Sequence, residues 1–130
     1  MTRCAKLAVT GLFVALSLVS SVAHAQGVTV DANRATRGKT VFNKNGCYVC
    51  HAFGRQLGAP DLIGVTDRRE QDWLRRWLKD TNGMLATDPQ AKAMLEQYRH
   101  VKMPQFKIGD SDIDAVIHFM AQESQRMRKA

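Results

Sequence analysis

Apolar residues recur along this chain at the three- and four-residue spacing of helices, and no stretch shows the sustained alternation of a strand. The clearest case is the segment 70–80, in which Trp73 and Trp77 lie four residues apart while Leu74 and Leu78 widen the same stripe. Basic residues occupy the other side. The pattern predicts a helix whose two tryptophans belong to the core.

Helix-capping residues mark the starts of the predicted helices. The candidates are Asn33 for a helix over 33–44, Thr66 or Asp67 for the helix that contains 70–80, Asp88 with Pro89 for a helix over 88–100, and Ser111 with Asp114 three positions later for the last helix. Loops rich in glycine or proline separate them at 52–65, 81–83 and 101–109. Four or five short helices joined by long loops predict an all-α fold.

The first 25 residues have the pattern of a secretory signal. Two basic residues precede an apolar run over 7–19 that is too short to span a bilayer comfortably, and Ala-His-Ala at 23–25 matches the cleavage pattern of small residues. We therefore expect a cleavable signal over 1–25 and one domain over 26–130. An uncleaved anchor is the alternative.

Two cysteines and a histidine follow the spacing C-x-x-C-H at Cys47, Cys50 and His51. This is the attachment signature of a c-type haem: the two thiols can reach the two vinyl groups of one porphyrin, and the histidine can reach the iron. The alternatives are half of a zinc site and a dithiol redox pair. Zinc would need two further clustered ligands, and a redox pair would need a preceding strand within a βαβ pattern; neither pattern is visible.

Loss of the signal changes both the cysteine count and the charge. Cys4 leaves with it, and the two remaining cysteines are used by the motif, so none is left for a structural disulfide. The formal net charge falls from +7 to +5, because two basic residues leave. The 105 residues that remain make a small core, which a buried porphyrin would enlarge.

The occupant of the second axial position of the iron distinguishes two functions. A protein ligand there is typical of electron transfer, and an open position is typical of gas binding or oxygen chemistry. Met103 is the leading candidate, because the proline after it fixes it in a loop outside the helices, from which it could cross the haem to face His51. An open site is one alternative. The other candidates are Met84 and His100 as ligands, Met94 and Met120 as core residues on apolar stripes, and His118 at the edge of the last helix.

The order of these pieces resembles class I c-type cytochromes, the small soluble monohaem kind, over roughly residues 33–125. The resemblance implies the cytochrome c fold, wrapped around one covalently attached haem c. It implies thioether links at Cys47 and Cys50, a proximal ligand at His51 and a distal ligand at Met103. It also implies that the carbonyl of Pro60 accepts from the His51 ring N–H, which strengthens the ligand.

The resemblance further implies that the first and last helices cross through Gly38, Phe42 and Phe119. A minor alternative to the core assignment of the tryptophans is that one indole N–H reaches a haem propionate.

We therefore expect a periplasmic carrier of single electrons and not an enzyme. Two alternatives stay open. One is a haem subunit of a larger periplasmic oxidoreductase, and the other is a peroxidase or gas sensor with an open site if Met103 is not a ligand.

The expected partners are redox proteins, with acidic docking surfaces if the basic residues near the haem form a docking face. The candidates for that face are Arg55, Arg68, Arg69, Lys102 and Lys107. They are equally well explained as ordinary solvated charge, and Arg55 or Arg68 could instead pair with a propionate. Export argues against a nucleic-acid partner, no membrane span is expected in the mature chain, and the sequence leaves monomer and subunit undecided.

Overall fold

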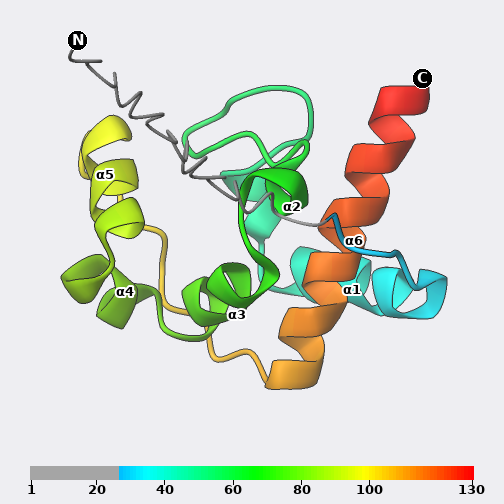
Figure 1. Cartoon of the computed structure of the whole chain (residues 1–130), viewed down its shortest axis with the longest axis horizontal. Helices are drawn as coiled ribbons and strands as arrows, with labels where there is room; N and C mark the ends of the chain where they lie inside the picture. The colour runs from blue at the N-terminus through cyan, green and yellow to red at the C-terminus, as the bar shows by residue number, and fades with distance from the viewer. Residues whose placement is uncertain (1–26) are drawn as a thin grey trace, which may run out of the picture.

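The computed structural model describes residues 27–130, and the regular secondary structure of this part of the chain is all helix, joined by loops, with no strand (Figure 1). The predicted signal over 1–25 lies outside the described residues. The elements are α1 (Ala32–Lys44), the short 3-10 helix η1 (Cys47–Val49), α2 (Val65–Arg68), α3 (Gln71–Lys79), α4 (Thr81–Thr87), α5 (Pro89–Gln97) and α6 (Asp110–Lys129). The all-α prediction is confirmed. Over residues 27–130 no helix is long and apolar enough to cross a bilayer.

The crossing of α1 and α6 forms the base of the core (Figure 1). Gly38 lies at the crossing, where a Cβ atom would stand 1.9 Å from the carbonyl oxygen of Ala115. Next to it the rings of Phe42 and Phe119 pack with their centroids 5.2 Å apart, and Phe53 from the following loop packs on both. The predicted crossing through Gly38, Phe42 and Phe119 is therefore confirmed.

Helix α3 packs its apolar face into the core and is joined to α6 by an ion pair. Trp73, Leu74 and Trp77 are buried. Arg75 Nε donates to Asp114 Oδ1 at 2.6 Å, and this bond raises the pKa of Arg75. The predicted capping role of Asp114 is wrong, because its carboxylate receives Arg75 and α6 begins at Asp110 without a side-chain cap.

The chain between 65 and 97 folds as four helices, whereas its sequence pattern predicts two. Gly64, in the left-handed conformation, precedes α2, so neither Thr66 nor Asp67 caps a long helix. The helix that contains 70–80 ends before residue 81, as predicted. The expected loop at 81–83 is wrong, because Asp80 accepts the Gly83 N–H at 2.9 Å and caps a new helix, α4.

Two aspartates cap α1 and α5. The predicted start of α5 is confirmed, with Asp88 accepting from the N–H groups of Gln90 and Ala91. The predicted cap of α1 is wrong by two positions, since Asp31 and not Asn33 accepts the Arg34 N–H at 2.9 Å.

Candidate haem site

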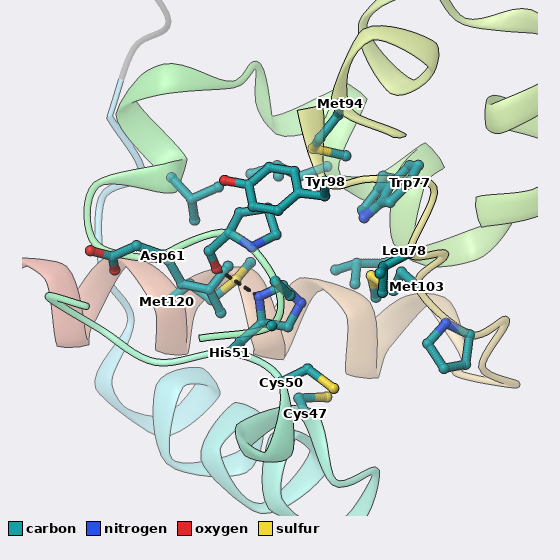
Figure 2. A pocket seen from close by; sticks show the side chains of 18 of the residues that line it. Cys47, Cys50, His51, Asp61, Trp77, Leu78, Met94, Tyr98, Met103 and Met120 are labelled. Atoms are coloured by element: carbon teal, nitrogen blue, oxygen red, sulfur yellow. Dashed lines mark hydrogen bonds between the residues drawn. The ribbon is translucent and has the colours of Figure 1, made fainter. Parts of the chain in front are cut away.

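A cavity of about 810 Å³ opens between η1, the loop that follows it, α3, α5, α6 and the segment 101–106 (Figure 2). Its wall is mainly apolar. Cofactor sites commonly have volumes of about 300 to 1,000 Å³, mostly apolar walls and a few well-placed polar groups. The cavity therefore has the size and character of a cofactor site.

His51 presents one ring nitrogen to this cavity. Its Nδ1 lies 2.8 Å from the carbonyl oxygen of Pro60, and because a carbonyl only accepts, Nδ1 carries the proton. The lone pair is thus on Nε2, which Figure 2 shows turned toward the side where Leu78 and Met103 lie. Burial lowers the pKa of His51, although the bond to Pro60 works in the opposite direction. A neutral imidazole with a free Nε2 is the form that binds a metal.

The two thiols of the motif lie beside His51. Gly46, in the left-handed conformation at φ 66°, reverses the chain after α1 and starts η1, which places Cys47 and Cys50 one turn apart. Figure 2 shows both sulfur atoms pointing the same way. Both cysteines are free thiols, and burial raises the pKa of Cys47. Two free thiols on one turn fit attachment to a single porphyrin.

The position of the Pro60 carbonyl depends on residues that no sequence pattern indicated as part of the site. Asp61 Oδ1 accepts the N–H groups of Gly54 at 2.8 Å and Ile63 at 2.9 Å, which closes the loop on both sides of Pro60. Arg68 donates to the carbonyl oxygens of Asp61 and Ile63. The hydrophobic periodicity of a sequence does not reveal hydrogen bonds of this kind. The one available signal was an aspartate in a glycine-rich stretch, because the short side chain of aspartate often stabilises a turn.

The loop is also tied to α6. The hydroxyl of Ser124, which is fully buried, accepts the Gly64 N–H at 2.8 Å and donates to the Met120 carbonyl at 2.7 Å. The loop that carries Pro60 is therefore held against the same helix that crosses α1.

Of the predicted iron ligands, the structure brings Met103 and His51 to one cavity. Met94 and Met120, predicted as core residues, pack in the core and also line this cavity. Met84 is buried away from it, and His100 is exposed with its ring 3.4 Å from the Glu96 carboxylate. Among residues 27–130 the two predicted alternative ligands therefore do not face His51.

The tryptophans are core residues, and they differ in how their N–H groups are used. The indole rings stack with centroids 5.5 Å apart and planes at 11°. Trp73 Nε1 donates to Asp88 at 3.2 Å. Trp77 Nε1 makes no hydrogen bond with any residue that the structure describes, and Trp77 lines the cavity. Of the two, only Trp77 has an N–H free for a group bound there.

The family model of cytochrome c matches residues 35–124. The chain belongs to the cytochrome c family. This confirms the resemblance seen in the sequence and the cofactor, one haem c attached through Cys47 and Cys50. Members of this family transfer electrons through their haem.

Solved structures of cytochromes c have similar folds. A cytochrome c from Rhodothermus marinus is 25% identical, covers 78% of this chain and 85% of its own, and gives a TM-score of 0.70. An engineered form of it, bound to a carbene intermediate, gives 0.66 at 25% identity over 77% and 85% of the two chains. The cytochrome c domain of the pp3183 protein from Pseudomonas putida is 38% identical over 71% of this chain and 92% of its own, with a TM-score of 0.63. A comparison with curated proteins gives no significant match.

The residues of this cavity fit a haem c. Two free thiols on one turn, a neutral imidazole with its Nε2 lone pair free, and an apolar cavity of about 810 Å³ are the features that the group requires. When bound, haem c supplies an iron that gains and loses one electron.

Proposed function

We propose that this protein is a periplasmic electron carrier in which His51 and Met103 hold the two axial positions of the haem iron. The observation that carries the proposal is the orientation of His51. Its bond to Pro60 leaves Nε2 free on the side of the cavity where Met103 lies. A nitrogen and a thioether on the two faces would leave no open position for oxygen or peroxide, which suits electron transfer.

The chain's own residues would set the redox properties. The Pro60 carbonyl makes the His51 imidazole a stronger donor, and the thioether of Met103 favours the ferrous state, which raises the potential. The apolar wall around Leu74, Trp77 and Val116 keeps water from the iron, so little solvent rearranges when an electron moves. No substrate bond is made or broken in this role.

The signal-like segment 1–25 of the sequence supports the periplasmic location. A signal of this kind delivers the chain across the membrane, where an oxidising environment would otherwise pair the two thiols. Their use as haem attachment points is consistent with that location.

The partners would be redox proteins that approach the mouth of the cavity. Three of the five basic residues considered for docking, Arg68, Arg69 and Lys102, line the cavity. The Arg68 guanidinium binds the Pro60 loop, and the guanidinium carbon of Arg69 lies 5.4 Å from the centre of a Trp73 ring. Lys102 is therefore the best candidate to meet an acidic partner.

An absorption spectrum of the purified ferric protein tests the ligand assignment. A thioether bound to ferric haem gives a weak band at the near-infrared edge of the visible spectrum. Met103→Leu keeps the volume and removes the sulfur, so we expect this band to disappear and the midpoint potential to fall. Met94→Leu and Met120→Leu change two other thioethers on the same cavity and are matched controls, which should keep the band. A band that survives Met103→Leu and disappears in a control would reassign the ligand.

A further inference from the structure

One methionine differs from the others in its exposure to solvent. Met127, in the last turn of α6, is 36% exposed, whereas Met84 and Met120 are 5% and 4% exposed. Met94 and Met103 are partly buried and pack against the core. In the described part of the chain, Met127 is therefore the only methionine whose side chain is exposed. Its thioether sulfur is a nucleophile that an oxidant in solution can reach directly.

A guanidinium group lies beside this sulfur. Arg126 Nη2 is 3.8 Å from Met127 Sδ. Glu123 holds the guanidinium in place, because its Oε2 accepts from Arg126 Nε at 3.0 Å and from Nη2 at 2.7 Å. These bonds raise the pKa of Arg126, so the group stays positively charged. A positive charge held next to the sulfur stabilises the negative charge that develops on a departing oxygen.

The end of the Met127 side chain lies against the loop that carries Pro60. A Cβ atom placed on Gly54 would stand 3.3 Å from Met127 Cε, so the methyl group packs on this glycine. Gly54 has φ 82°, and its N–H donates to Asp61 Oδ1 at 2.8 Å. A chemical change at the Met127 sulfur is therefore made next to a bond that fixes this loop.

We propose that Met127 is a reversible oxidation site, at which hydrogen peroxide forms methionine sulfoxide with the help of Arg126 and loosens the loop at Gly54. A lone pair of the sulfur attacks one peroxide oxygen, and the O–O bond breaks. The proton on the attached oxygen passes to the departing hydroxide, which leaves as water. The sulfur is oxidised and the peroxide is reduced by the same electron pair. The inference goes beyond electron transfer and does not depend on which residue is the distal iron ligand.

Oxidation changes the polarity of a side chain that makes an apolar contact. The sulfoxide is polar, and its oxygen accepts hydrogen bonds. Arg126 Nη2 is a donor within reach of that oxygen. A sulfoxide oxygen that turns toward Arg126 and water draws the methyl group away from Gly54. The bond from the Gly54 N–H to Asp61 is then less protected from water and opens more often.

Peptide mapping by mass spectrometry, after the holoprotein is treated with limiting hydrogen peroxide, tests the site. We expect Met127 to be oxidised before Met94 and Met103. Arg126→Gln should slow this oxidation by roughly two- to fivefold. Lys129→Gln removes the same charge from a position that makes no hydrogen bond to the sulfur and should leave the rate unchanged. Earlier oxidation of another methionine overturns the site, and equal rates in wild type and Arg126→Gln overturn the role of Arg126.

Exchange of the Gly54 amide, followed by NMR in the ferrous holoprotein, tests the effect on the loop. We expect exchange to be roughly two- to fivefold faster in the sulfoxide form. A methionine sulfoxide reductase, with a thiol as reductant, should restore the original rate. Met127→Leu keeps an apolar side chain without sulfur, so peroxide should not change its Gly54 exchange. Exchange that peroxide leaves unchanged in wild type, or changes equally in Met127→Leu, overturns the link to the loop.

Discussion

The backbone N–H of Asp31 donates to Nδ1 of His118 at 3.1 Å, and so connects the residue before α1 to the middle of α6. His118 was expected at the edge of the last helix, but it is 7% exposed. Because Nδ1 accepts, the ring proton is on Nε2, and a neutral histidine holds the start of α1 in place. The bond thus stabilises the helix crossing on which the haem loop rests.

His118→Leu should destabilise the protein, since it leaves the Asp31 N–H without its partner. We expect a loss of about 1 kcal/mol in the free energy of unfolding, measured by urea denaturation of the holoprotein. His118→Asn places a carbonyl oxygen near the position of Nδ1 and should restore part of the loss. Equal stability of the two variants would show that the hydrogen bond does not contribute.

Gly38→Ala should be destabilising although alanine favours helices. The added Cβ would stand 1.9 Å from the Ala115 carbonyl oxygen and 2.9 Å from the Phe119 Cβ, so α1 and α6 must separate. Overpacking of this kind typically costs about 1 to 3 kcal/mol, which exceeds the gain in propensity of about 1 kcal/mol. Lys39→Ala, one position along on the exposed side of α1, is the control and should change stability by less than about 0.5 kcal/mol. A Gly38→Ala protein as stable as this control would refute the close crossing.

Asp61→Ala should change the midpoint potential of the haem, although Asp61 is not an iron ligand. It removes the acceptor for the Gly54 and Ile63 N–H groups, so the Pro60 carbonyl loses its fixed position beside His51. A weaker bond to Nδ1–H makes the imidazole a poorer donor, which destabilises the ferric state, and the midpoint potential should rise. Asp61→Asn keeps an oxygen acceptor and should lie closer to wild type. A potential unchanged in Asp61→Ala would show that Pro60 is positioned by other contacts.

The N-cap aspartates predict a loss of stability in acid. Hydrogen bonds from the Ala91 and Arg34 N–H groups hold the pKa values of Asp88 and Asp31 below the ordinary 3.8. A carboxyl group whose pKa is lower in the folded state stabilises the fold above pH 3.8 and loses that contribution as the pH falls through its folded pKa. In Asp88→Asn the side chain does not titrate, so its Tm should fall less than that of wild type between pH 7 and about pH 3. Equal falls would assign the acid sensitivity to other groups.

The sequence predicted the parts of the site that lie close together in the chain. C-x-x-C-H located both thiols and the proximal histidine, and the proline after Met103 marked the segment that reaches the cavity. It did not predict the pairs that join distant segments, such as Arg75 with Asp114, Gly64 with Ser124, and Asp31 with His118, which are 39, 60 and 87 residues apart. A polar residue shows no periodicity that reveals a distant partner, so these bonds became visible only in three dimensions.

If Lys102 meets an acidic redox partner, its positive charge should increase the rate of electron exchange with that partner. Lys102 lines the cavity, so Lys102→Gln should lower the second-order rate constant at low ionic strength and make it less dependent on salt. Lys39→Gln removes the same charge from α1, on an exposed position that does not line the cavity, and should have a smaller effect. Stopped-flow rates over a series of salt concentrations give both slopes. A wild-type rate that does not change with salt, or equal slopes for the two variants, would contradict docking at this mouth.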